Sequence, residues 1–450
     1  MKIELRNAYR AYSLDALAHI ERISADPATK IPVIQRNKWV RKDDTFQPTT
    51  ETTPFAWVLY DRAKKDLHNL PSYLALEKLF ESNPELKAQL DSLVGGAGAG
   101  SMRRDRFAIF GAVVLQMLHE SPQFALSEER ADEISAQIVD DLLSDKIVHI
   151  RTTPILGLRT EDEITLDDGL SIRPLSDTLT SRFLELGIQI GNRLASPYGD
   201  FYHDVTKVAI FLTKPFRKVI NPTSTSDVDA KAWHDFASGN VETTVLDTLR
   251  IFKSGDIRVA GTITEAQGLF RSGTSYGPLG VHGQVLMSTA YALSKHEHSA
   301  FTALYRALKA KSSTPSLSLA VRRFSIAADR QQLDDKLVDY FICAEALFLP
   351  DAEDELSFRL AIRAAHFLAE DKAEQRRVFE FFRRAYHARS RIVHGKTLKN
   401  LKDSSGKIVP LGQFVGELEG YLRKAISEIL LSKRFSGILA KSEWDQLLFN

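Results

Sequence analysis

The pattern of apolar and polar positions changes twice along the chain and divides it into three parts. In the first part, apolar residues recur at spacings of three and four over residues 74–93 and 127–143, which is typical of amphipathic helices. Pro84 interrupts the first of these segments. We therefore expect residues 1–145 to form a mostly helical N-terminal region.

The middle part, residues 146–295, combines the patterns of strands and helices. Residues 146–151 alternate between apolar and polar side chains as a strand does, and an Asp-Asp-Gly turn within residues 163–173 predicts a hairpin. A short apolar run at 208–212 predicts a buried strand. The sequence thus predicts a mixed α+β region, to which we assign a sensing or regulatory role.

Residues 296–450 have the pattern of consecutive amphipathic helices joined by short polar connections. This pattern predicts an all-α helical bundle. The predicted fold class is therefore an α+β N-terminal portion followed by an all-α helical bundle. The predicted helices of the bundle span residues 298–311, 316–328, 331–348, 355–370, 373–394 and 411–432.

Composition and charge narrow the class of protein. The hydrophobic fraction of 44% and the charged fraction of 26% are those of a globular chain. No apolar run of about 18 residues predicts a membrane span, and Met1 to Arg6 carry charges where a signal peptide has an apolar core. We expect a cytoplasmic protein without a membrane partner. Because the net charge is only +1, any surface that binds nucleic acid must be local.

The side chains that could hold a metal are sparse. The single cysteine, Cys343, excludes an intrachain disulfide and a zinc site built from several thiolates, and its apolar neighbours favour a buried structural thiol. Histidines such as His296 and His298 have no convincing set of further ligands nearby in the sequence. We expect neither a metal nor a cofactor.

The segment Phe382–Gly395 contains the residues best suited to chemistry, Arg389 and His394, with four residues between them. An arginine keeps its charge at physiological pH and offers phosphate oxygens a planar set of donors. A histidine takes up or releases a proton near neutrality. Because RNA carries its own nucleophile, the 2′-hydroxyl, these two groups could cleave it without a metal. In an arbitrary protein, the same pair would be ordinary surface or core residues.

Helix geometry imposes a condition on this pair. Five residues correspond to a rotation of about 140°, so the side chains of Arg389 and His394 do not share one face of an ideal helix. Either the helix loosens near Gly395, or another helix or a second subunit completes the site. A dimer with twofold symmetry is the commonest arrangement that brings two such helices together.

Further blocks lie upstream of this segment. They are Leu319–Phe324, Leu333–Asp339, Ala344–Phe348 and Glu355–Ala365. Together with Arg389-x4-His394 inside Arg-Ser-Arg-Ile-Val-His-Gly, these ordered blocks resemble an Apea-like domain of the HEPN ribonuclease superfamily, over about residues 300–435.

The resemblance implies a metal-independent endoribonuclease that leaves a 2′,3′-cyclic phosphate after attack by the 2′-hydroxyl. It implies acid–base chemistry for His394 and contact with the phosphate and the transition state for Arg389. It also implies an RNA substrate and a homodimer formed through the HEPN domain. The protein would then be a defence or toxin-type effector, for example one that causes abortive infection as a defence against phage. Active members often have Asn, Asp or His directly after the arginine, where this chain has Ser390, which is also able to form a hydrogen bond.

Glu345 lies in an apolar run, so its carboxylate needs a cation or a hydrogen-bond donor. We expect Arg359, Arg363 or Arg389 to be that partner. The pair would either orient an arginine toward the site or only fix the register of two helices. Glu355 stands four residues before Arg359, which predicts a further ion pair along one helix face.

Two aromatic residues flank the motif. Tyr386 precedes Arg389 by one turn and could stack on an RNA base or pack in the core. His387 lies close to the expected face of His394, where it could assist catalysis or be merely solvated.

Two other functions fit the same residues. A HEPN-like domain without catalysis would bind RNA, a nucleotide or a partner protein, and His394→Ala would then leave binding largely intact. Alternatively, the bundle would only dimerise the chain for an activity in the N-terminal half, although no nucleophile–base pair is recognisable there. In the ribonuclease interpretation, an unidentified trigger or inhibitor would act on residues 1–295.

Overall fold

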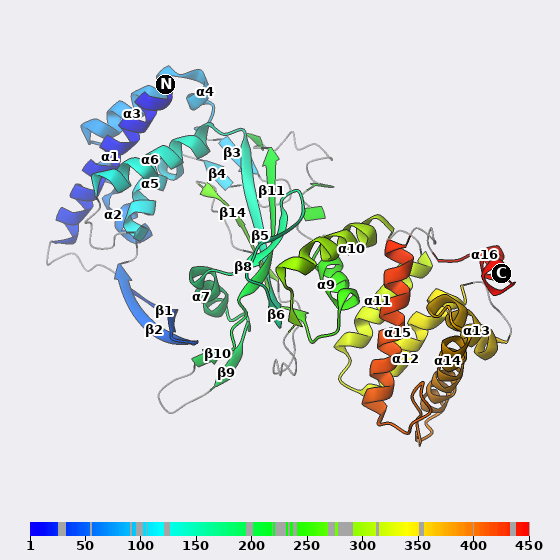
Figure 1. The fold of residues 1–450 in the computed structure, drawn as a ribbon. Coiled ribbons are helices and arrows are strands. Elements are labelled where there is room, and N and C mark those ends of the chain that lie inside the picture. Colours follow the sequence, from blue (N-terminus) through cyan, green and yellow to red (C-terminus); the bar gives the residue numbers. More distant parts are fainter. Residues whose placement is uncertain are drawn as a thin grey trace.

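The structure is a computed structural model, and it describes most of the chain. An N-terminal group of helices, a central region of sheets and a C-terminal group of helices follow one another along the molecule (Figure 1). The described residues are 1–25, 33–54, 56–90, 92–95, 102–104, 106–120, 127–194, 201–217, 219–220, 231–232, 235–236, 241–268, 275–277, 291–311, 315–350, 355–398, 400–432 and 438–449.

The N-terminal helices enclose an apolar core of their own. The rings of Tyr9 and Phe110 both pack edge-on against Phe80 in this core. The predicted helix at 127–143 is confirmed, and so is the predicted break at Pro84, although that helical segment ends at Lys87. The helices are α1 (Lys2–Ser24), α2 (Ala56–Leu67), α3 (Pro71–Ser82), α4 (Pro84–Lys87), α5 (Arg106–Glu120) and α6 (Glu128–Leu143).

Two small sheets connect this helical region to the middle of the chain. A long hairpin, β1 (Val33–Lys42) and β2 (Thr45–Pro54), continues through β10 (Phe201–His203) to β9 (Asn192–Leu194). The second sheet has the order β12-β3-β4, formed by Val219–Ile220, Ser92–Gly95 and Met102–Arg104. Residues 1–145 are therefore mostly helical, as predicted, but they also contribute strands to sheets shared with the middle region.

The central sheet is antiparallel and has the order β15-β14-β5-β11-β8-β7. Its two longest strands pair from Lys146 with Arg217 to Pro154 with Ala209. The predicted strands at 146–151 and 208–212 and the predicted hairpin at 163–173 are confirmed, and both strands extend beyond their predicted ends. The strands are β5 (Lys146–Leu156), β7 (Ile164–Asp167), β8 (Leu170–Pro174), β11 (Val208–Arg217), β14 (Thr262–Ala266) and β15 (Ser275–Gly277), with β13 (Arg258–Val259) pairing to the end of β5 and β6 (Leu158–Arg159) pairing with β16 (Tyr291–Ala292).

Helices cover both faces of the central sheet (Figure 1). Neighbouring strand residues point to opposite faces, and Ile210 and Phe211 of β11 accordingly belong to different apolar clusters. Ile210 shares its cluster with α9 (Val241–Phe252) and α10 (His298–Lys311), whereas Phe211 shares its cluster with α7 (Asp177–Glu185).

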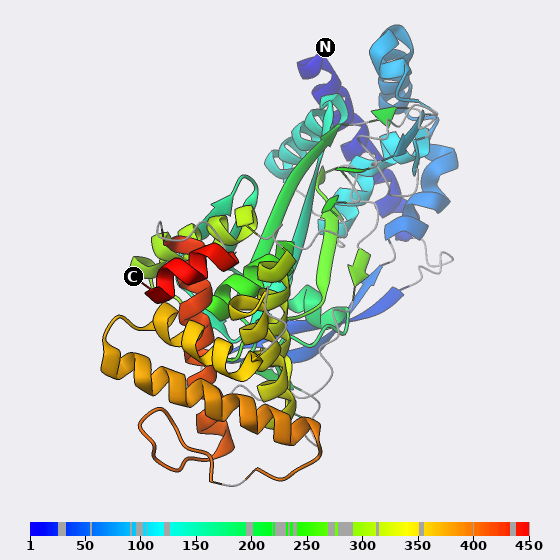
Figure 2. The same cartoon turned by 90° about the vertical axis from the view of Figure 1, so that its right-hand side faces the viewer.

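The C-terminal helices form a bundle with a large apolar core (Figure 2). Each predicted helix of the bundle is confirmed within two residues at both ends. Trp444 of the last helix, which was not predicted, is buried in the same core. Following the short η3 (Lys295–Glu297) and α10, the helices are α11 (Pro315–Asp329), α12 (Leu333–Phe348), α13 (Leu356–Leu368), α14 (Lys372–Val393), α15 (Leu411–Leu431) and α16 (Lys441–Phe449).

None of the helices within the described ranges has the length and apolar composition that a membrane span requires.

Helix α9 joins the sheet to the bundle through a buried ionic contact near each end. At its start, Glu242 accepts a hydrogen bond from Arg151 on β5, and both side chains are less than a tenth exposed. At its end, the buried guanidinium of Arg250 donates to the Asp329 carboxylate and to the hydroxyl and carbonyl oxygens of Ser325, all on α11. The Nε of Arg423 on α15 donates to the carbonyl oxygen of Arg250 at 3.1 Å. α9 therefore packs on both parts of the molecule, although it lies within the predicted middle region.

Replacing Arg250 should destabilise this junction strongly. In Arg250→Met, the aliphatic stem remains but the Ser325 carbonyl and hydroxyl groups lose a buried donor, so we expect a loss of about 3 kcal/mol in the free energy of unfolding. Urea unfolding followed by circular dichroism measures this change. The matched control is Arg41→Met, which removes a half-exposed pair with Asp177, and its effect should stay below about 1 kcal/mol. Equal effects of the two substitutions would contradict the role given to Arg250.

Candidate functional site

The motif lies at the end of α14, which stays helical through Val393. His394 is the C-terminal cap, and its backbone N–H still donates to the Ser390 carbonyl at 3.2 Å. The chain then turns through Gly395, whose φ of 65° is left-handed and favours glycine. The N–H of Lys396 closes the turn by donating to the Arg391 carbonyl at 2.8 Å. The helix therefore does not loosen before His394, and the rotation expected for a regular helix applies.

Arg389 and His394 consequently point in different directions. Arg389 faces α12, with its side chain 29% exposed, whereas His394 is exposed to solvent. The structure does not bring the two side chains together within one chain. Of the alternatives left open by the sequence, completion of the site by a group from outside α14 is the one that this geometry retains.

Glu345 is paired with Arg389 rather than with the other two candidate arginines. Its Oε2 lies 3.9 Å from Nη2 of Arg389, and the Glu345 side chain is 27% exposed. Burial raises the pKa of the Glu345 carboxyl above its ordinary value, and the nearby Arg389 charge opposes this shift. The Nε of Arg389 is buried and has no hydrogen-bond partner among the described residues. Glu345 is therefore an ion-pair partner beyond hydrogen-bond distance, and the Arg389 side chain stays partly exposed.

Arg363 and Arg359 have other roles. Arg363 is buried, donates to the carbonyl oxygen of Phe348 at 2.9 Å and lies over the ring of Trp444, which secures α16 to the bundle. Arg359 is half-buried and forms no ion pair with any residue in the described ranges. Glu355 precedes α13 with a φ of 52°, and its carbonyl oxygen accepts hydrogen bonds from the N–H groups of Phe358 and Arg359. The predicted Glu355–Arg359 ion pair is therefore absent from the part of the chain that is described.

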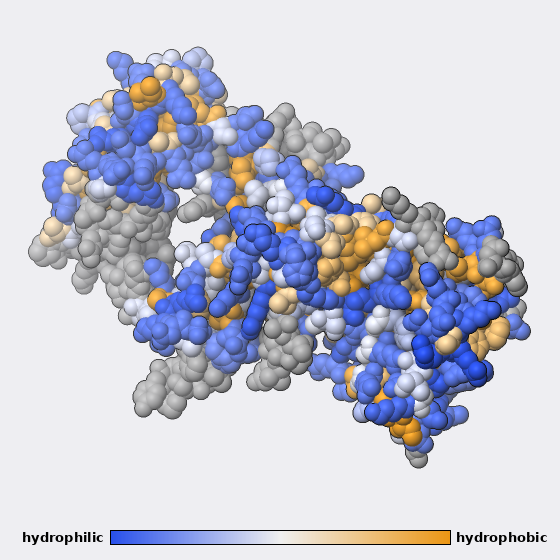
Figure 3. Space-filling view, viewed as in Figure 1, coloured by the Kyte–Doolittle hydropathy of each residue, from blue (hydrophilic) through white to orange (hydrophobic). Residues whose placement is uncertain are grey.

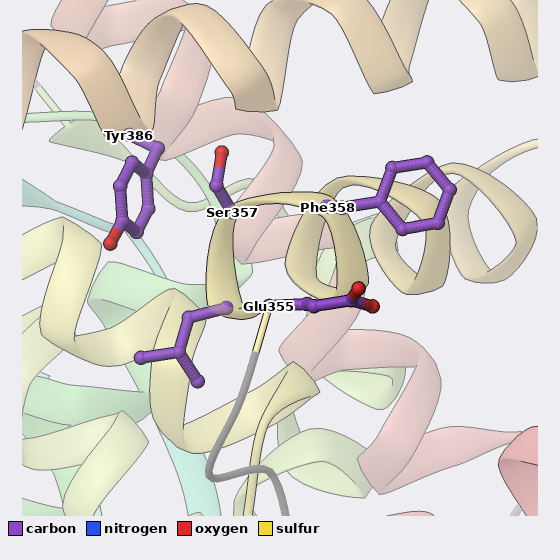
Figure 4. A pocket seen from close by; sticks show the side chains of 5 residues that line it. Glu355, Ser357, Phe358 and Tyr386 are labelled. Carbon is purple, nitrogen blue, oxygen red and sulfur yellow. The ribbon is translucent and has the colours of Figure 1, made fainter.

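Tyr386 is both a packing residue and part of a surface hollow. Its ring packs edge-on against Phe341 at 5.7 Å. The remaining side lines an open hollow of about 570 Å³ between α14 and the start of α13. In Figure 4, Tyr386 hangs from α14 beside Ser357 of α13, whereas Glu355 and Phe358 extend toward the other side of the hollow. Packing against Phe341 is thus observed, and the exposed side of the ring stays free for a ligand.

Ser390 and His387 lie on the same helix. Ser390 is half-buried, and its carbonyl oxygen accepts the hydrogen bond from the His394 backbone. His387 is exposed and precedes His394 by seven residues, which is about two helical turns. His387 therefore shares a face with His394, as expected.

Neither a cluster of possible metal ligands nor an exposed thiol occurs among the described side chains. Within the described ranges, no three His, Cys, Asp or Glu side chains gather in an arrangement that could hold a metal ion. Cys343 is fully buried, and burial raises the pKa of its thiol.

Another buried carboxylate of the bundle was not predicted from the sequence. Asp339 of α12 is 4% exposed at its side chain and accepts hydrogen bonds from Arg323 and Arg330, each at 2.8 Å. The signal that could have revealed it is the position of Asp339 between Leu337 and Tyr340, on the buried side of an amphipathic helix. Because the Asp339 carboxylate is paired with both Arg323 and Arg330, we assign it a structural role.

The chain matches no protein-family model, no curated protein and no solved structure.

A double-mutant cycle tests the Glu345–Arg389 pair. In Arg389→Met, the Glu345 carboxylate keeps its burial but loses its cation, so its pKa rises further and the free energy of unfolding at pH 7 should fall by about 1 kcal/mol. The deficit is present above the raised pKa and should disappear as the pH falls below about 4.3, where Glu345 is protonated in the folded and unfolded states alike. Unfolding in urea at a series of pH values measures this dependence.

The second arm of the cycle is Glu345→Gln combined with Arg389→Met. This double variant should be more stable at pH 7 than Arg389→Met alone and should lack its pH dependence, because no buried carboxylate remains. Strictly additive effects at every pH would show that the two side chains do not interact.

Proposed function

We propose that this protein is a metal-independent endoribonuclease of the HEPN type, a defence or toxin-type effector that acts as a homodimer. The observation that carries the proposal is the end of α14. There Arg389 forms an ion pair with Glu345, and His394 is presented to solvent at the C-terminal cap of the helix. This arrangement agrees with the resemblance of the sequence blocks and supplies the two kinds of group that RNA cleavage needs.

In the proposed reaction, the 2′-hydroxyl oxygen of RNA forms a bond to the adjacent phosphorus. The bond between phosphorus and the 5′-oxygen breaks, which leaves a 2′,3′-cyclic phosphate and a 5′-hydroxyl. His394 accepts the proton of the 2′-hydroxyl or donates a proton to the leaving oxygen. The guanidinium of Arg389 stabilises the negative charge that builds up on the phosphorane oxygens.

The homodimer is part of the proposal because one chain does not direct both groups to one phosphate. Arg389 and His394 are separated by a rotation of about 140° on a helix that stays regular. In a twofold dimer, two α14 helices that cross near their ends place the histidine of one copy beside the arginine of the other. The N-terminal helices and sheets would then hold a trigger or inhibitor that restrains the enzyme.

The same geometry supports a second candidate, a non-catalytic module that binds RNA, a nucleotide or a protein. The separation of Arg389 from His394 favours it, since binding does not require the two groups to converge on one atom. The two candidates differ in the effect of His394→Ala. In the ribonuclease this substitution should abolish catalysis alone, whereas in the binding module it should change binding little.

Cleavage of cellular RNA in EDTA separates these functions. We expect the wild type to produce cyclic phosphate ends, and we expect Arg389→Ala and His394→Ala each to lower the cleavage rate by about 100-fold or more. Matched controls are Arg377→Ala, an exposed arginine of the same helix, and His296→Ala, an exposed histidine of η3. Both controls should retain the wild-type rate.

Other outcomes have definite meanings. Cleavage that survives in both motif variants would refute the assignment of the site. If wild-type expression arrests growth but the purified protein does not cleave, a trigger is required; without either effect, the binding module is the better description.

A further inference from the structure

Helix α14 is strongly basic in a chain of nearly zero net charge. It contains seven Lys and Arg side chains against two Glu, a formal charge of +5, whereas the whole chain has +1. Such a local excess is the electrostatic feature expected of a surface that binds a polyanion.

Three of the seven cations follow one line along the solvent face of the helix, together with two histidines. Counting back from His394, Arg376 lies 18 residues away, which is about five full turns, and Arg383 lies 11 residues away, which is about three turns. Lys372 and His387 fall within about 40° of the same line, and so does the exposed carboxylate of Glu380. We call this set the cationic stripe; its members, all exposed, are Lys372, Arg376, Arg383, His387 and His394.

Much of this charge is free to bind a ligand. Arg376 pairs with Glu380 at 3.2 Å and is 82% exposed. Lys372 and Arg383 form no ion pair with any residue of the described ranges, and Arg383 lies over the Phe379 ring at 5.9 Å. An exposed ion pair contributes little to stability, so packing alone does not account for the stripe.

The opposite face of α14 is fully committed to the bundle. Phe381 and Phe382 are buried, and their rings pack against Tyr421 of α15. In Figure 2, α14 (orange) runs across the near side of the bundle, so that its outer face lies at the molecular surface. Figure 3 shows that the visible surface of the C-terminal half is largely hydrophilic.

An aromatic row runs beside the cationic stripe. Phe379 and Tyr386 are seven residues apart, so they share one side of α14, about 60° around the helix from the middle of the stripe. Phe358 of α13 is 53% exposed and packs edge-on against Phe379 at 5.7 Å. The hollow lined by Tyr386, Phe358 and Ser357 opens between the two helices (Figure 4).

We infer that the outer face of α14 is a binding track for single-stranded RNA, which leads the strand to His394. Its phosphates lie along the cationic stripe, and its bases reach the aromatic row and the hollow, where they stack. Proteins that bind single strands combine these two features, a positive surface and exposed aromatic rings. The stripe covers 23 residues, from Lys372 to His394, with a rise of about 33 Å, which is enough for about ten stacked nucleotides. The inference rests on the proposed function in taking RNA as the ligand, and it assigns binding residues outside the Arg389–His394 motif.

The test measures binding apart from cleavage. A fluorescein-labelled 2′-O-methyl oligouridine of 20 nucleotides lacks the attacking hydroxyl, and fluorescence anisotropy of its complex with the full chain gives the Kd at several salt concentrations. In Lys372→Gln/Arg383→Gln, each lost phosphate contact should weaken binding about five-fold at 100 mM salt, hence about 25-fold together. The slope of log K against log salt should become shallower by about 1.4.

The aromatic row has its own variant, Phe358→Ala, whose side chain is more than half exposed. It should weaken binding about five-fold or more through lost stacking and leave the salt slope unchanged. The control is Arg377→Gln, which removes one positive charge from another side of α14, against two in the stripe variant, and should change the Kd less than two-fold. Circular dichroism confirms that each variant is folded.

The outcomes separate this inference from the proposed function. Unchanged Kd and salt slope in Lys372→Gln/Arg383→Gln would overturn the track, even if His394→Ala abolishes cleavage. A loss of about five-fold in Arg377→Gln, the loss expected for each charge of the stripe, would also overturn it, because the effect would then follow total charge rather than the stripe. If Lys372→Gln/Arg383→Gln loses RNA binding but neither Arg389→Ala nor His394→Ala changes cleavage, the binding track is supported and the ribonuclease proposal fails. Equally tight and equally mutation-sensitive binding of double-stranded RNA would contradict the preference for a single strand.

Discussion

The buried guanidinium of Arg250 is the contact on which the relation between the two halves of the molecule depends. It lies at the end of α9, where it reaches Ser325 and Asp329 of α11 and the carbonyl oxygen of Ile257 beyond its own helix. A buried arginine with several fixed acceptors tolerates little displacement, because each lost acceptor leaves a buried donor unsatisfied. Burial also raises the pKa of the neighbouring Asp247 carboxyl, to about 6.

The other end of α9 is fixed in the same way. Glu242 meets Arg151 and Thr153 on β5, the strand at the centre of the main sheet. α9 is a helix of 12 residues, about 18 Å long. It connects the Glu242–Arg151 contact at its start to the Arg250–Asp329 contact at its end. A rearrangement of β5 that displaces Arg151 must therefore either break a buried pair or move α9 and α11 with it. In the proposed function, a trigger or inhibitor bound at the sheets would act on the bundle through this connection.

Most of the bundle could be predicted from the sequence because its helices are amphipathic and bounded by polar connections. The opposite orientation of Arg389 and His394 was also predictable, since it follows from the pitch of a helix that Gly395 ends one residue after the histidine. The long helix α1 was not predicted, because its buried side is formed partly by tyrosines and alanines and contrasts weakly with its polar side. The hairpin of β1 and β2 was missed as well, since its strands are largely polar, and its link to a distant part of the chain is the pairing of Phe46 on β2 with Tyr202 on β10.

The partner of Glu345 illustrates a different limit. Sequence reasoning correctly demanded a cation, but three arginines stood at plausible helical positions. The packing of α12 against α14 selects Arg389, while Trp444 and the Phe348 carbonyl take Arg363. The contacts of α9 could not be predicted from the sequence for the same reason, since Arg250 and Ser325 are 75 residues apart in the chain. Tertiary packing, not local pattern, decides which of several equivalent charges becomes buried.

The two faces of α14 explain why the motif is divided. The inner face is fixed by aromatic packing and places Arg389 against Glu345. The outer face carries His394 in line with the exposed side chains of Arg376 and Arg383. Turning the helix to bring His394 inward would expose Phe381 and Phe382, at several kcal/mol in lost burial. The separation is therefore a stable property of the fold, and only something that approaches from outside can bridge it. In the proposed homodimer, a second copy of the helix would supply the missing group, and an RNA strand along the outer face would supply the phosphate on which both groups act.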